Sequence, residues 1–61
     1  MTIQAHATEI QQGDYVAYDS DRGERRRIEA RKILRDVGCI HVWTCDRVVT
    51  FRDLYSVEIE R

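Results

Sequence analysis

The sequence predicts a mostly β fold, in which five to six short strands form one small barrel. Residues Ser56 to Glu60 alternate between polar and apolar side chains, which is the pattern of a strand with one buried face. β-branched and aromatic residues dominate Cys39 to Cys45 and Val48 to Phe51, and single glycines separate the main segments. Closure into a barrel would also protect the edges of so small a sheet.

The length and composition predict one domain over residues 1–61. The chain has 61 residues, of which 43% are hydrophobic and 34% charged, and its formal net charge is −1. This balance is too apolar and too neutral for a disordered chain. A domain of about 60 residues buries only about 60% of the surface that its unfolded chain exposes, so we expect marginal stability.

Local patterns predict the remaining short elements. Thr2 to Ala5 and Tyr15 to Tyr18 are predicted to be strands. The capping-box pattern Thr8-Glu9-Ile10-Gln11 predicts a short helical turn near residues 8–11. Arg52 to Tyr55 predicts a tight turn or a 3-10 turn near residues 52–55, in which Leu54 fills the core.

Residues 24–37 are compatible with two structures. A helix at about 22–37 would end before Gly38 and would place the apolar residues on one face, which gives an α+β fold with this helix packed on a small antiparallel sheet. Those apolar residues are Ala30, Ile33, Leu34 and Val37. A strand would instead bury Ile28 and Ala30 and would need a bulge near Arg31-Lys32. The local pattern alone slightly favours the helix.

A family resemblance shifts this balance. The chain has a Gly-Asp-x-Val entry at Gly13-Asp14-Tyr15-Val16, a long segment that turns at Gly38, and a terminal strand after the turn at Arg52 to Tyr55. In this order the features resemble small SH3-like β-barrel domains, including those of short open reading frames of phages and bacteria. The resemblance implies that residues 24–37 are strand. We therefore predict the mostly β fold and keep the α+β fold as the alternative.

We expect a cytoplasmic protein with two free thiols and no membrane partner. No apolar run exceeds four residues, so neither a membrane span of about 20 apolar residues nor a secretory signal core of about 7 to 15 is predicted. If Cys39 to Cys45 is an extended strand, its two sulfurs lie about 20 Å apart, which is beyond the reach of a disulfide.

The sequence predicts no catalytic residues, no metal and no cofactor. Cys39 and His41, with Cys45 and His6, invite a zinc interpretation, but small zinc sites use close Cys or His pairs that turns present. The two histidines are far apart in sequence, no base stands near either serine, and no glycine-rich phosphate loop exists. A chain this short also provides little scaffold behind a catalytic cleft. We therefore predict a non-enzymatic binding module.

The strand from Cys39 to Cys45 is the first candidate binding surface. If Ile40 and Val42 point inward, strand alternation places an unusually apolar set on the opposite face. The candidate partner-binding residues are Trp43, His41, Cys39, Tyr15 and Tyr18. A strand that is apolar on both faces predicts that another chain covers one of them, either a second copy, with a dimer favoured, or another protein. The alternative is the reverse register, with Trp43 in the core.

A basic segment is the second candidate surface. It carries seven basic side chains against two acidic ones, whereas the rest of the chain carries an excess of six negative charges. The basic residues are Arg22, Arg25, Arg26, Arg27, Arg31, Lys32 and Arg35. Clustered arginines are typical of phosphate recognition, so nucleic-acid binding is the alternative function. The sequence pI of about 6.1 opposes it, and the segment is equally compatible with a solvated face.

Overall fold

The computed structural model describes residues 1–61 and contains seven strands, one 3-10 turn and no α-helix. The elements are β1 (Thr2–His6), η1 (Ala7–Glu9), β2 (Tyr15–Asp19), β3 (Arg25–Glu29), β4 (Lys32–Asp36), β5 (Cys39–Trp43), β6 (Val48–Arg52) and β7 (Ser56–Glu60). The mostly β prediction is confirmed, and the alternative with a helix at about 22–37 is wrong. None of the elements is a helix with the length and apolarity needed to cross a membrane.

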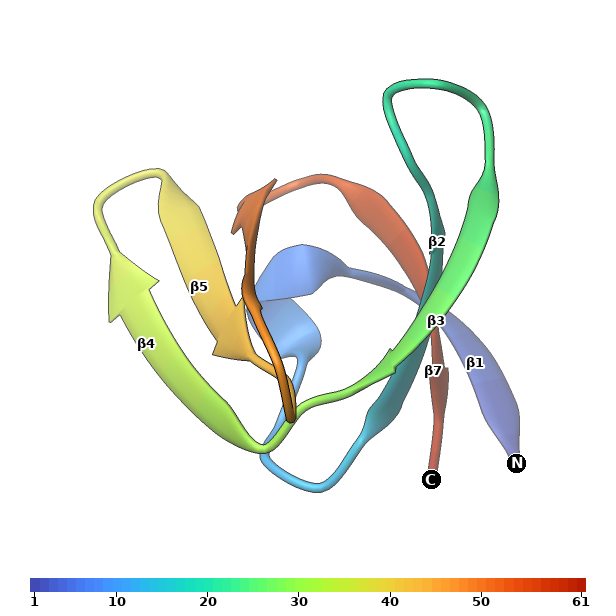
Figure 1. The fold of residues 1–61 in the computed structure, drawn as a ribbon, viewed down its shortest axis with the longest axis horizontal. Helices are drawn as coiled ribbons and strands as arrows, with labels where there is room; N and C mark the ends of the chain where they lie inside the picture. Colours follow the sequence, from blue (N-terminus) through green and yellow to red (C-terminus); the bar gives the residue numbers. More distant parts are fainter.

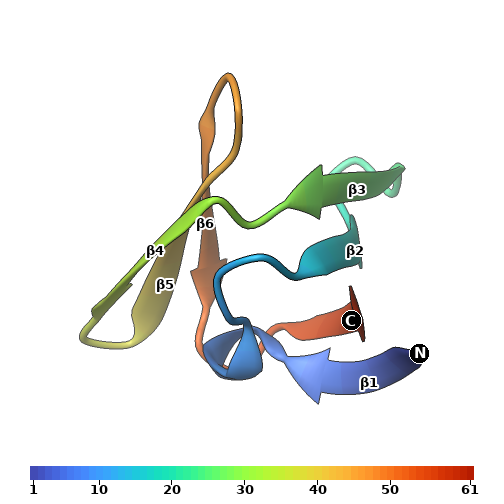
Figure 2. The ribbon, with the colours of Figure 1, turned by 90° about the horizontal axis from the view of Figure 1, so that it is seen from below.

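The strands form two antiparallel sheets. One has the order β1-β7-β2-β3 and the other has the order β4-β5-β6. The two sheets face each other at an angle, with η1 at the corner between them (Figures 1 and 2). The chain ends lie side by side, because the Arg61 N–H donates to the Met1 carbonyl at 3.1 Å. This arrangement is consistent with the predicted small barrel, although seven strands form rather than five or six.

The long basic segment passes from one sheet to the other at Ala30 and Arg31. The Ala30 N–H donates to the Asp14 carbonyl at 2.8 Å, and the Ala30 carbonyl accepts from the Gly13 N–H at 2.7 Å. One residue later, the Arg31 N–H donates to the Trp43 carbonyl at 2.9 Å. The backbone therefore leaves the β2 side and joins the β5 side within two residues. In place of the bulge expected near Arg31-Lys32, the strand is interrupted at Ala30 and Arg31, where the chain changes sheets.

The helical spacing of the apolar residues in 24–37 favoured the wrong structure, because pairing with strands distant in sequence outweighs this local preference. A helix would have buried Leu34 and Val37, yet these side chains are 53% and 97% exposed. All five residues of β3 pair with β2, and all five of β4 pair with β5. Strand formation depends on such neighbours rather than on local spacing, so a sequence pattern can favour the wrong state.

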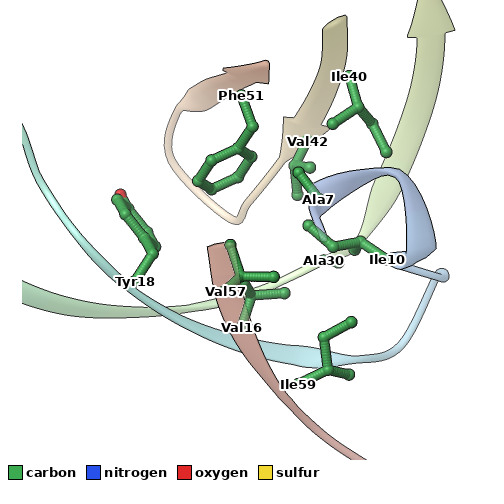
Figure 3. Packing of buried hydrophobic residues seen from close by; sticks show 10 residues of the cluster. All are labelled: Ala7, Ile10, Val16, Tyr18, Ala30, Ile40, Val42, Phe51, Val57 and Ile59. Atoms are coloured by element: carbon green, nitrogen blue, oxygen red, sulfur yellow. The ribbon is translucent and has the colours of Figure 1, made fainter. Parts of the chain in front are cut away.

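One hydrophobic core lies between the two sheets (Figure 3). The largest fully buried side chains are Ile10, Val16, Ile40, Val42 and Ile59. Tyr18 of one sheet meets Phe51 of the other edge-to-face, with ring centroids 4.9 Å apart and an angle of 88° between the planes. The core confirms that Ile40 and Val42 point inward, so the reverse register with Trp43 in the core is wrong.

The two predicted short turns differ in detail from the expectation. η1 begins at Ala7, one residue before the expected turn, because the Glu9 carboxylate accepts the His6 N–H at 2.9 Å and makes His6 the cap. Between β6 and β7, a single turn closes with the Tyr55 N–H donating to the Arg52 carbonyl at 3.0 Å. Leu54 does not fill the core. It is 72% exposed, because the middle of this turn projects outward, and the Tyr55 ring lies 5.8 Å from Phe51 instead.

Asp14 is the buried charged residue of the fold, with 5% exposure. Its carboxylate accepts the Gln11 N–H at 2.9 Å, which closes the turn before β2. The Arg61 guanidinium donates to the same carboxylate at 3.1 Å and to the Glu9 carbonyl at 3.2 Å. Asp14 therefore ties the C-terminus to the turn that precedes β2.

Asp14→Ala should lower the free energy of unfolding by about 1–3 kcal/mol, because the Gln11 N–H and the Arg61 guanidinium lose their buried charged acceptor. Asp19→Ala is the matched control, since its side chain is exposed and pairs only with the exposed Arg25. The control should cost less than about 1 kcal/mol. Urea denaturation measures both, and equal losses in the two variants would contradict the role given to Asp14.

Candidate binding surface

The outer face of the three-stranded sheet is the candidate binding surface, which we call the Trp43 face. Strand register places three rows of side chains on it, one row from each strand. Its residues are Lys32, Leu34 and Asp36 from β4, Cys39, His41 and Trp43 from β5, and Val48, Thr50 and Arg52 from β6. The predicted alternation of β5 is therefore confirmed, and it brings in neighbours from both flanking strands.

The Trp43 face is apolar at one end and in the middle. Leu34 and Val48 are 53% and 48% exposed, although both are large aliphatic side chains. Trp43 lies between their strands and is half-buried, with the Lys32 ammonium 5.4 Å from its ring centroid and the His41 ring 6.4 Å away. The aliphatic stem of a lysine can cover apolar surface while its charge stays in water. Lys32 therefore covers part of the Trp43 ring within the chain.

The outer face of the four-stranded sheet is chemically opposite. Arginines of β3 form ion pairs with carboxylates of β7 across the intervening strand: Arg25 with Glu58 at 2.8 Å, and Arg27 with Glu60 at 3.1 Å. Gln4 of β1 donates to Glu58 at 3.3 Å. These side chains are largely exposed, and they satisfy one another and the solvent. Charged and hydrogen-bonded side chains therefore dominate this surface.

At the β4–β5 turn, three metal-ligating side chain types come together. The Cys39 Sγ lies 3.6 Å from the His41 Nε2, which lies 3.8 Å from an Asp36 carboxylate oxygen. All three potential ligand atoms lie within 4.8 Å of one another. The other ring nitrogen of His41 is 2.9 Å from the Thr50 hydroxyl, which fixes the orientation of the ring. These residues could hold a metal ion.

The two tyrosines predicted as partner-binding residues lie away from the Trp43 face. Tyr18 is 7% exposed and belongs to the core. Tyr15 lies on the outer face of the other sheet and is 42% exposed, with the Arg27 guanidinium 4.7 Å from its ring centroid. The structure therefore groups Trp43, His41 and Cys39 and separates both tyrosines from them.

A shallow depression of about 550 Å³ lies where the two sheets diverge. Its wall includes Tyr18, Asp19, Asp21, Phe51, Arg52 and Tyr55. The Tyr55 hydroxyl donates to the Asp19 carbonyl and so links the two sides. The depression opens broadly to solvent and has both polar and apolar lining.

The basic segment does not form one surface. Three of its arginines are in ion pairs: Arg25 with Asp19 and Glu58, Arg26 with Glu24, and Arg27 with Glu60. Arg35 points back across the fold and donates to the Ile10 carbonyl at 2.8 Å and the Thr8 carbonyl at 3.3 Å. Lys32 lies over Trp43 on the other sheet. Arg22 and Arg31 are exposed and make no ion pair.

The turn between β5 and β6 holds a carboxylate with a shifted pKa. The Thr44 hydroxyl donates to the Asp46 carboxylate at 3.1 Å, and Arg47 adds a positive charge beside it. The hydrogen bond, followed by the charge of Arg47, lowers the pKa of Asp46 below its usual value. The second cysteine, Cys45, is exposed in this turn and is a free thiol like Cys39.

Thr44→Val should raise the pKa of Asp46 towards its ordinary value, because the largest favourable contact of the ionised carboxylate is removed. Since the folded-state pKa is depressed, the contact stabilises the turn above the ordinary pKa and is lost as the pH falls through the lowered value. A carboxyl-carbon NMR titration measures this, with Thr50→Val as the control. An unchanged Asp46 titration in Thr44→Val would contradict the assignment.

In comparisons with known proteins, no family model, curated protein or solved structure matches the chain.

Five residues of the Trp43 face were not singled out as binding residues by the sequence patterns. They are Leu34, Asp36, Val48, Thr50 and Arg52. The signal that could have found Asp36 is the short turn Asp36-Val37-Gly38-Cys39, since a two-residue hairpin turn places the residues that flank it opposite each other. Gly38 has a φ of +76°, which this turn requires.

Proposed function

We propose that this chain is a non-enzymatic binding module that self-associates through the Trp43 face. The observation that carries the proposal is the contrast between the two outer sheet faces. One is covered by a ladder of ion pairs, whereas the other exposes Leu34 and Val48 beside a half-buried Trp43. Exposed aliphatic and aromatic side chains that form one patch are typical of an interface, and tryptophan is enriched among residues that dominate binding energy.

The charges at the ends of β4 favour a second copy as the occupant. Lys32 and Asp36 lie on the same face about 13 Å apart along the strand. A twofold axis parallel to the face and perpendicular to its strands would reverse the strand direction of the second copy. Lys32 of each copy would then lie over Asp36 of the other, and the two Leu34 side chains would meet at the centre. The surface is thus complementary to itself, as a twofold dimer requires.

Burial of this face would also offset the small size of the domain. The hydrophobic core contains only ten residues, and two of them are alanines. Oligomerisation is one of the usual ways in which chains of this length add stabilising apolar burial. The proposal therefore ties the exposed patch to the stability of the folded chain.

We expect the purified chain to sediment as a dimer, and Leu34→Glu to weaken the dimer by about 100-fold or more, because two buried leucines are lost and two charges enter the interface. Leu34 is exposed in the single chain, so the substitution leaves the core intact. Sedimentation equilibrium over a range of concentrations measures the association constant.

Leu54→Glu is the matched control. It is the same substitution at a more exposed leucine, in the turn after β6 rather than on the Trp43 face. Arg26→Glu, in the other sheet, is a second control. Both should dimerise like the parent chain. A parent chain that remains monomeric at several hundred micromolar, or a Leu34→Glu variant that dimerises normally, would refute self-association.

Nucleic-acid binding is the second candidate, supported by Arg22 and Arg31, which are free of ion pairs. We expect no binding of labelled single- or double-stranded DNA or RNA at low salt, because most of the basic segment is neutralised by carboxylates or bonded to the backbone. Fluorescence anisotropy measures this. Binding that weakens steeply with salt, and that falls further in Arg22→Gln and Arg31→Gln, would favour the alternative.

We also propose an SH3-like relationship and a cytoplasmic location. The bent segment that contributes to both sheets and the terminal strand after a tight turn support the first. Two free thiols, one of them exposed, support the second, since such thiols persist in reducing compartments.

A further inference from the structure

The cluster at the β4–β5 turn has the chemistry of a metal site. Thiolate, imidazole and carboxylate together are a ligand set that suits zinc-type divalent ions. In a tetrahedral site with metal–ligand bonds of about 2.0–2.3 Å, ligand atoms lie about 3.3–3.7 Å apart. The Cys39 Sγ and His41 Nε2 are 3.6 Å apart, and the Asp36 oxygen is 3.8 Å from the same nitrogen. Small side-chain rotations would bring all three onto one ion.

Neighbouring groups orient the candidate ligands towards one another. Thr50 lies 2.9 Å from the His41 Nδ1, and a hydrogen bond from Nδ1–H to its hydroxyl leaves the lone pair of Nε2 directed at the cluster. One Asp36 oxygen accepts the Val37 N–H at 2.7 Å, so the carboxylate is held while its other oxygen faces His41. The strand register itself sets Asp36 opposite Cys39. The ligands are positioned by backbone that is fixed by strand pairing.

We propose that Asp36, Cys39 and His41 bind one divalent zinc-type ion, with Cys39 as the thiolate and a solvent molecule in the fourth position. In the single chain Cys39 and His41 are half-buried and Asp36 is exposed, so an ion can enter from solvent before two copies associate. The site goes beyond the proposed self-association and lies at the opposite end of β5 from Trp43. It shares Asp36 with the contact to Lys32 of a second copy, so the ion and that lysine would compete for this carboxylate.

Cobalt titration of the reduced chain tests the site, because Co²⁺ adopts zinc sites and reports a bound thiolate by its absorption. We expect a thiolate-to-cobalt charge-transfer band that saturates at one equivalent and that zinc abolishes. Cys39→Ser should lose the band, whereas Cys45→Ser should keep it. Cys45 is the matched control, since it is the other free thiol and lies outside the cluster. Absence of the band, or its loss in Cys45→Ser, would overturn the proposal.

Thr50→Val separates a built site from a chance contact of cysteine with cobalt. It keeps all three ligands and the strand shape but removes the hydroxyl beside His41. Loss of such a supporting partner lowers metal affinity by about 10–100-fold, so the band should remain and require more cobalt. An unchanged affinity in Thr50→Val, or in Asp36→Asn, would overturn the three-ligand site. Circular dichroism of each variant without metal confirms that the strands persist.

The metal site and the dimer can fail independently. Leu34→Glu retains all three ligands, so it should bind cobalt as a monomer. Cys39→Ser retains Lys32, Leu34 and Trp43, so it should lose cobalt binding and remain a dimer. If Leu34→Glu lost both properties, the three-ligand site within one chain would be wrong, because the ion would then depend on the second copy.

Discussion

Residues 25–36 form one strand in each sheet, and the backbone hydrogen bonds of Ala30 and Arg31 determine where the chain passes from one sheet to the other. Ala30 is fully buried and bonds to the turn before β2, whereas Arg31 bonds to the end of β5. Because side chains alternate along a strand, the position of this change fixes which residues of β4 face the core. Ile33 turns inward and Leu34 outward. A slip of one residue would exchange their environments, so that Ile33 would replace Leu34 on the Trp43 face.

A domain of this size has only one core, so each sheet keeps one face towards the outside. The four-stranded sheet covers that face with charged side chains that pair across strands. The three-stranded sheet carries the charges of Lys32, Asp36 and Arg52 at the ends of the face and has Leu34, His41 and Thr50 in the middle. The difference follows from sequence alternation alone, since both sheets bury the same kinds of residue inside. The charged face of the four-stranded sheet is well solvated by water. The exposed apolar side chains of the Trp43 face would be better covered by a second protein surface.

The sequence was sufficient where alternation was strict. Ser56 to Glu60 forms the predicted strand. The strand from Cys39 is apolar on both faces, so its sequence left the direction of Ile40 and Val42 open, and the structure shows both side chains buried. The sequence was insufficient for residues 25–36, because helical spacing and strand pairing both fit the apolar positions and only the neighbouring strands decide between them. Asp36 was missed for a related reason. Its distance from Cys39 depends on the register of the hairpin at Gly38, which the sequence indicates only once residues 32–36 are known to be a strand.

The basic residues that are clustered in the sequence point to different surfaces of the folded chain. Alternation sends Arg25 and Arg27 to the outer face of β3, where they reach across β2 to Glu58 and Glu60 of β7. Ala17 lies between these strands in register with both Arg27 and Glu58, and its small side chain leaves the long arginines room to cross. Part of the positive excess of one segment and part of the negative excess of the other thus meet on a single sheet face. These pairs neutralise Arg25 and Arg27 locally, which weakens the electrostatic field that would attract a polyanion to β3.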